Sequence, residues 1–439
     1  MSATLAPVPT PPTTPYAGNG DPFLFKRVRT WWLLLALLLL ADENSIFTVA
    51  SRPSKSLNTL TSNASRSTSL LQLLTVTLWL IVAGLMVTRL GPTLRLMLKQ
   101  RAILSFAILA FLSTLWTQIP PQVTFRKATW LFLVFGFAWF FASCYRPADQ
   151  MRLLLVAGLI LALASIAMAI LLPQYGLDSG GEWKGVFGQK NHLGLAMLFL
   201  FAGLFFRPIS RGRRLLAVAI QAILPIGLIV LSQSRGSLIL ILLLIVVRLY
   251  GPFLGDRRRD QLPFVLYASV LSIVAIAFSR GVLLSLLGRD STLTGRTREW
   301  AVLVFYALRH LWLGYGYQAF WSGTADSFHA MRSIGANIYG ADSGYLETML
   351  ELGIVGVGLW FILLMIVLSN ILRLLRRPSV PLEGYWYAGI ILVTFAGSVT
   401  EVLFPVPAGI STFVFVVACA GLTNLGREVA PRPEFRSGS

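Results

Sequence analysis

The run LETMLELGIVGVGLWFILLMIVLSNIL, residues 346–372, decides the fold class of this chain. Its only charged residues are two carboxylates near the start, Glu347 and Glu351. An α-helix rises about 1.5 Å per residue, so roughly 20 apolar residues cross the hydrocarbon core of a bilayer. Because a backbone in lipid must satisfy its own hydrogen bonds, this run predicts a transmembrane helix.

Similar apolar runs recur along the whole chain. Of its 439 residues, 56% are hydrophobic and only 13% are charged, and the mean hydropathy is +0.72. The sequence therefore predicts an all-α integral membrane protein with about twelve transmembrane helices. The predicted spans are about 30–49, 70–88, 102–117, 128–144, 152–172, 192–207, 215–232, 236–250, 263–281, 346–372, 384–401 and 403–425.

The spans divide the chain into five parts. Residues 1–29 are predicted to be a disordered cytoplasmic tail, 30–281 helices 1–9, 282–345 a long external (periplasmic) loop, 346–425 helices 10–12, and 426–439 a cytoplasmic tail. Asp42, Glu43 and Asn44 interrupt the first span. Because buried carboxylates are costly, either that span ends early, which we favour, or these groups face an aqueous cavity.

The basic residues set the orientation. The net charge of +19 could indicate nucleic acid as a partner, but the lysines and arginines lie in short clusters between apolar runs. Such clusters mark cytoplasmic loops, and with this assignment both termini are cytoplasmic and residues 282–345 are external. Cys144 and Cys419 are too few and too apolar in context for a metal site or a disulfide framework.

The chemistry is predicted to lie at helix ends and outer loops. The chain has neither a G-x-x-x-x-G-K-[ST] motif nor a G-x-G-x-x-G motif between a strand and a helix, so no nucleotide cofactor is expected. One outer patch, residues 183–192, places Lys190 and Asn191 where an apolar run begins. The start of a helix can bind an anion, so this patch is a candidate anion site. The simpler interpretation is that its lysines only bracket a turn. A second patch, residues 232–237, holds Arg235. This arginine could simply extend its charged end to the membrane surface. Its serine and glycine neighbours favour the alternative, a contact with phosphate.

The third patch lies in the long loop. It comprises residues 294–300 with Arg296, the Gly314-Tyr315-Gly316 motif, and residues 341–346. Arginines alternate with aromatic residues throughout this loop, which also holds His329. Arginine forks bind phosphate or carboxylate, and aromatic faces stack on sugar rings. The alternative is a solvated connector with an amphipathic helix on the membrane.

Taken in order, these elements resemble the O-antigen ligase and Wzy-type polymerase superfamily, in particular bacterial exopolysaccharide-production proteins. The resemblance extends over roughly residues 100–372. Its elements are Leu115-Trp116-Thr117 through Arg126, Gly188-Gln189-Lys190-Asn191, Ser234-Arg235-Gly236, Gly295-Arg296 with Trp300, Gly314-Tyr315-Gly316, and Gly344-Tyr345-Leu346 with residues 351–356.

The resemblance implies a metal-independent membrane glycosyltransferase in the bacterial inner (plasma) membrane. Such an enzyme transfers a glycan from undecaprenyl diphosphate to a glycan or lipid-linked acceptor at the outer face of that membrane, without cofactor or nucleic acid. The resemblance implies that Arg235 and Arg296 bind the donor diphosphate, with Lys190, Asn191 and Tyr345 as further substrate-binding candidates. Preorganised guanidinium groups stabilise the charge that develops as the glycosyl bond breaks.

The chain departs from the family at one catalytic position. Many ligases carry a His-Asn pair where this chain has Asp342-Ser343. Asp342 is therefore the candidate base, with His329 as the alternative, and a third possibility is that Asp342 only caps the following helix. The missing His-Asn favours a polymerase over a ligase.

The rival class is a polytopic transporter or flippase of lipid-linked glycans. Such folds usually show repeated halves and mid-membrane ionisable residues. Residues 1–220 and 221–439 show no convincing match, and the carboxylates lie mostly in the outer halves of the spans. The sequence therefore favours glycosyl transfer.

Overall fold

The computed structural model describes residues 23–41, 77–178, 180–207, 214–251, 296–335, 338, 340–377, 380–407 and 409–428. Within these ranges every regular element is a helix, apart from an isolated bridge between Leu177 and Trp183. The predicted all-α class is confirmed there. Asp42, Glu43, Asn44 and the span predicted at 263–281 lie outside the described residues.

The helices follow the apolar runs of the sequence. The first group comprises α1 Phe23–Ala41, a helix at Thr77–Val87, α4 Leu90–Lys99, α5 Arg101–Leu112, α6 Pro121–Cys144, α7 Pro147–Leu171, the short α8 Pro173–Gly176, α9 Lys190–Phe205, α10 Arg214–Leu231 and α11 Arg235–Tyr250. The second comprises α13 Arg296–Arg309, α14 Ala325–Ile334, α15 Gly344–Leu375, α16 Leu382–Gly397 and α17 Ile410–Glu428. Proline stands in the first turn of α6 and α7, where its missing N–H costs nothing.

Three of these helices, α6, α7 and α15, are long and apolar enough to cross a membrane. The pair Thr77–Val87 and Leu90–Lys99 makes a fourth if it is counted as one span, although it is bent by 90°. Several other apolar helices are shorter. The membrane character is thus supported, while the number of twelve spans stays a prediction.

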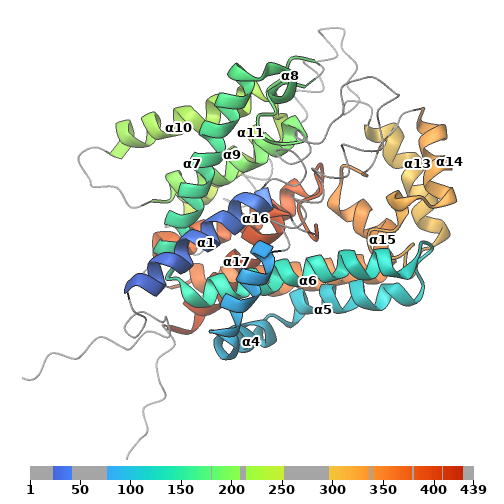
Figure 1. Cartoon of the computed structure of the whole chain (residues 1–439), viewed down its shortest axis with the longest axis horizontal. Helices are drawn as coiled ribbons and strands as arrows, with labels where there is room; N and C mark the ends of the chain where they lie inside the picture. Colours follow the sequence, from blue (N-terminus) through green and yellow to red (C-terminus); the bar gives the residue numbers. More distant parts are fainter. Residues whose placement is uncertain are drawn as a thin grey trace, which may run out of the picture.

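Aromatic side chains fill the space between the helices. Figure 1 shows α5, α6 and α15 running alongside one another, with α16 and α17 between them and the group α7, α9, α10 and α11. At the centre, the ring of Phe404 lies 5.1 Å from Phe106 and 5.2 Å from Trp360, both edge to face. This is the geometry that aromatic pairs prefer, and all three side chains are buried.

The helix α15 is broken at Gly353, whose φ of 62° and ψ of −160° are not helical. A break in a helix leaves backbone groups unpaired, which is tolerated in a membrane only where other protein groups satisfy them. The segment that contains Gly314-Tyr315-Gly316 provides these partners. Backbone N–H groups donate from Tyr315 to Leu350 (2.8 Å), from Gly316 to Glu351 (2.9 Å) and from Ile354 to Leu311 (2.7 Å).

The predicted external loop contains a small helical unit with its own core. Helices α13 and α14 lie together at one end of α15 (Figure 1). Leu303 and Tyr306 of α13, Ala330 of α14 and Leu350 of α15 are among the buried residues of this second core. The position of this unit outside the membrane stays a prediction.

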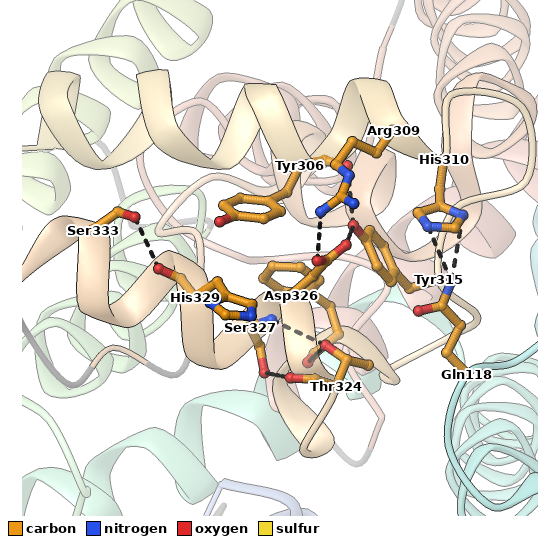
Figure 2. A network of polar contacts seen from close by, with 11 residues as sticks. Gln118, Tyr306, Arg309, His310, Tyr315, Thr324, Asp326, Ser327, His329 and Ser333 are labelled. Carbon is orange, nitrogen blue, oxygen red and sulfur yellow. Dashed lines mark hydrogen bonds and ion pairs between the residues drawn. The ribbon is translucent and has the colours of Figure 1, made fainter.

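A polar network fastens α13 to α14 (Figure 2). Arg309 Nη1 lies 2.6 Å from Asp326 Oδ1, and the Tyr315 hydroxyl donates to Asp326 Oδ2 at 2.6 Å. Burial, together with the bond to Asp326, raises the pKa of the Tyr315 phenol, which therefore remains a donor. At the edge of the network, Gln118 Nε2 lies 3.0 Å from His310 Nε2.

Candidate active site at the start of α15

Arg296 is the centre of a charged cluster. It is the first residue of α13, and its Nη2 lies 3.1 Å from Asp342 Oδ2 and 3.2 Å from Glu401 Oε1. Its Nη1 donates to the carbonyl of Thr400. The side chain is only 17% exposed. One arginine thus joins the start of α13, the turn before α15 and the loop after α16.

The turn before α15 holds Asp342 against Arg296. Asp342 has a φ of 46°, a left-handed conformation that Asp and Asn tolerate better than most residues. The preceding residue, Ala341, is fixed on both sides, because its carbonyl accepts from Trp300 Nε1 and its N–H donates to Glu347 Oε2, each at 2.8 Å. Glu347 is 5% exposed. The carboxylate of Asp342 is therefore placed by its backbone.

The capping alternative for Asp342 does not match the helix boundary. The N-cap of α15 is Ser343, and that position makes no side-chain capping hydrogen bond. Asp342 stands one residue earlier, with its carboxylate toward Arg296. The N–H of Gly344 donates instead to the carbonyl of Ser398 at 2.8 Å. N-capping of α15 therefore does not account for the carboxylate at position 342.

Glu401 extends the cluster toward α9. Its Oε1 also accepts from Asn191 Nδ2 at 2.9 Å. Burial raises the pKa of the Glu401 carboxyl, and the neighbouring Arg296 opposes that rise. Glu401 lines a cavity of about 40 Å³ together with His192, Gly236 and Ser411. The starts of α9 and α11 and the loop after α16 therefore meet beside Arg296.

Arg235 directly precedes a residue that lines this cavity. It is the first residue of α11, and its side chain is exposed. The next residue, Gly236, lines the cavity, and a Cβ there would lie 3.8 Å from Thr400 Oγ1. No hydrogen bond or ion pair links the Arg235 guanidinium to any of the described residues. It is thus a cation available to a ligand, next to the residues that Arg296 contacts.

The remaining candidates make contacts of other kinds. Lys190 pairs with Glu182 at 3.0 Å, and this contact lowers the pKa of the Glu182 carboxyl. The Tyr345 hydroxyl donates to the carbonyl of Phe395 at 2.9 Å. His329 is exposed on α14, and within the described ranges nothing bonds it to Arg296 or Asp342. Of the candidate site residues, Arg296, Asp342 and Asn191 meet in one cluster.

Glu401 was not among the site residues predicted from the sequence. The signal was a carboxylate between two apolar runs, placed at the end of a predicted span. The helix α16 instead ends at Gly397, and this leaves Glu401 in a loop that folds back over the site. In the part of the chain that the structure describes, no group of three or more His, Cys, Asp or Glu could hold a metal ion. The metal independence of the reaction stays a prediction.

Comparison with known proteins supports the family resemblance. Residues 220–361 match the family model described as O-antigen ligase, an interval that includes Arg235, Arg296 and Asp342. The exopolysaccharide production protein ExoQ of Rhizobium meliloti (strain 1021) is 27% identical over 270 residues, which cover 56% of this chain and 60% of that relative. The match thus spans about three fifths of the relative's length. Both findings agree with the resemblance drawn from the sequence motifs: this chain is similar to the O-antigen ligase/Wzy-type family.

Proposed function

We propose that this chain is a membrane glycosyltransferase of exopolysaccharide or O-antigen synthesis. It moves a glycan from an undecaprenyl-diphosphate-linked donor to a glycan or lipid-linked acceptor at the outer face of the bacterial inner membrane. The chain crosses this membrane several times with both termini cytoplasmic. One observation carries the proposal: Arg296, a phosphate-binding type of residue, meets two carboxylates at helix ends, beside the exposed Arg235.

The two arginines bind the donor diphosphate. A guanidinium group offers two parallel donors to phosphate oxygens, which a lysine cannot reproduce. Arg235 has the further advantage of the first turn of α11, where free N–H groups and the helix dipole favour an anion. As the bond between the anomeric carbon and the diphosphate oxygen breaks, negative charge grows on the leaving diphosphate. Arg235 and Arg296 stabilise that charge.

Asp342 accepts the proton of the acceptor hydroxyl. The acceptor oxygen then forms a bond to the anomeric carbon, and undecaprenyl diphosphate departs. Without a donor, Arg296 contacts both Asp342 and Glu401. When the diphosphate binds Arg296, the Asp342 carboxylate gives up part of that contact. Its oxygens are then free to accept from the acceptor hydroxyl.

The other candidates have supporting roles in this scheme. Asn191 holds Glu401 at 2.9 Å, so it orients the carboxylate that positions Arg296. Lys190 and Tyr345 lie at the starts of α9 and α15, where they contribute to substrate binding. His329 is the alternative base, and it would require α14 to bring its exposed side chain to the cluster.

The test is product analysis with purified protein and an undecaprenyl-diphosphate oligosaccharide. Longer lipid-linked chains identify a polymerase, and transfer to lipid A core identifies a ligase. Movement of the lipid-linked glycan across a vesicle membrane without a new glycosidic bond would identify a flippase and overturn the proposal. Arg298→Ala is the matched control for Arg296→Ala, because Arg298 is an exposed arginine in the same first turn of α13.

A further inference from the structure

A second polar cavity lies at the opposite end of α15. It has a volume of about 440 Å³. Its basic lining consists of Lys99 and Arg101, where α4 meets α5, and Arg373 and Arg377 at the end of α15. No carboxylate is among its lining residues in the described part of the chain. An anion there would meet basic residues from three helices.

The same cavity has an apolar wall. Ile103 of α5, Leu363 and Val367 of α15, and Leu422 of α17 line it beside the basic residues. All four side chains are buried. A small hydrated anion gains nothing from such a wall, whereas an acyl chain does, because burial of apolar surface is favourable. The cavity therefore suits a ligand with a charged head and an apolar tail.

Gln100 supplies an independent sign of a missing ligand. Its side chain lines the cavity and is only 7% exposed. Its Oε1 accepts from Trp139 Nε1 at 2.8 Å, and this bond fixes which way the amide points. The Nε2 group has no hydrogen-bond partner among the described residues. A buried donor without an acceptor is costly, and a ligand oxygen would satisfy it.

The cavity and the candidate active site lie at opposite ends of α15. Beyond the break at Gly353, residues 354–373 of α15 extend about 30 Å at 1.5 Å per residue, close to the thickness of the hydrocarbon core of a bilayer. Basic residues alone are common on the cytoplasmic side and need no ligand. That rule explains neither the cavity between them, nor its apolar wall, nor the unpaired Gln100 amide.

We propose that this cavity binds the phosphate headgroup of an anionic membrane phospholipid, with Arg101 and Arg373 as the main contacts. Basic pockets between membrane helices at the cytoplasmic surface are suited to such headgroups. The lipid tail lies along the wall formed by α5, α15 and α17. The site is separate from the glycosyl-transfer cluster and does not depend on the proposed reaction.

The test uses the full-length protein, stripped of lipid in a neutral detergent. Phosphatidylglycerol, phosphatidylcholine with the same acyl chains, and inorganic phosphate are added separately. Native mass spectrometry reports retained lipid, and tryptophan fluorescence reports thermal unfolding. Only phosphatidylglycerol is expected to be retained and to raise the unfolding temperature. Each of Arg101→Gln and Arg373→Gln should weaken its binding about fivefold, and the double variant roughly twenty-five-fold.

Arg95→Gln is the matched control, because Arg95 is exposed on α4 and does not line the cavity. It should bind phosphatidylglycerol as the wild type does. Equal loss in this control would reduce the effect to diffuse attraction and overturn the site. Equal retention of phosphatidylcholine would show an apolar groove without headgroup selectivity, and equal stabilisation by inorganic phosphate would show a site for free anions. Either result would contradict an anionic-phospholipid site. If a variant folds poorly, wild-type binding that persists from 0.1 to 0.5 M salt refutes the charge contact.

Discussion

Replacement of Asp342 by asparagine separates chemistry from folding in this protein. Asparagine has nearly the same shape as aspartate, but it cannot take up a proton. It also tolerates the left-handed backbone that Asp342 adopts, with φ of 46°. The substitution thus removes the proposed base and changes little else. An alanine in its place would add backbone strain and make the result ambiguous.

The structure sets the expected magnitudes. The Asp342 side chain is 46% exposed, so its ion pair with Arg296 is partly screened and contributes about 0–1 kcal/mol to stability. The free energy of unfolding should therefore fall by no more than about 1 kcal/mol. Loss of a general base lowers turnover by roughly 10²–10⁴-fold. An effect of that size on turnover cannot arise from the small change in stability.

Asp326→Asn is the matched control. Asp326 also pairs with an arginine of α13, Arg309, at 2.6 Å, but it is only 15% exposed and accepts from Tyr315 as well. Loss of its charge should cost about 1–3 kcal/mol of stability and leave turnover per folded molecule unchanged. The assay is the rate of glycan transfer, normalised to folded protein by its thermal unfolding signal. Asp342→Asn with more than a tenth of wild-type turnover would refute the role of Asp342 as the base.

Three further predictions concern the donor site, its pH dependence and the topology. Arg235→Ala and Arg296→Ala should each abolish transfer in the same assay. Lysine at either position should restore little of it, since a point charge does not reproduce a bidentate contact. Full rescue by lysine would argue against bidentate binding of the diphosphate. Because burial raises the pKa of Glu401, its carboxylate forms only above the ordinary value of 4.5, so transfer should decline as the pH falls through the raised pKa. Glu401→Gln should lower turnover and remove that decline, and an unchanged acid limb of the pH–rate profile would exclude Glu401. A cysteine at exposed Gln189 should react with an impermeant reagent from outside and one at Arg376 should not; the opposite pattern would invert the topology.

The apolar runs of the sequence were sufficient to locate most of the helices. Eleven of the predicted spans overlap helices of the structure, and the span at 263–281 lies outside the described residues. The predicted and observed helix boundaries differ most after α16. Spans were predicted at 384–401 and 403–425, whereas α16 ends at Gly397 and α17 begins at Ile410. Leu403 and Phe404 between them are buried in the core as a loop, and hydropathy cannot distinguish such a segment from a helix.

The site was predictable only in part, for the same reason. Arg296 and Asp342 stood out because each lies in a polar motif next to an apolar run, and the structure places them 3.1 Å apart. Glu401 joins them only because the loop after α16 folds back across the starts of α13 and α15. Such a return depends on packing between distant segments, which periodicity along the chain does not encode.

The contact between Gly314 and the break in α15 at Gly353 restricts how this chain can be recombined with its relatives. A Cβ at Gly314 would collide with the backbone of Glu351, and one at Gly353 with the backbone of Trp312. The segment around Gly314 and the broken turn of α15 therefore have to be exchanged together, although Gly314 belongs to the connecting segment and Gly353 to a helix. A chimera that exchanges residues 296–343 alone would take the Gly314 side of this contact from one protein and the Gly353 side from another. The exchange should extend through residue 356 to carry both halves of the contact.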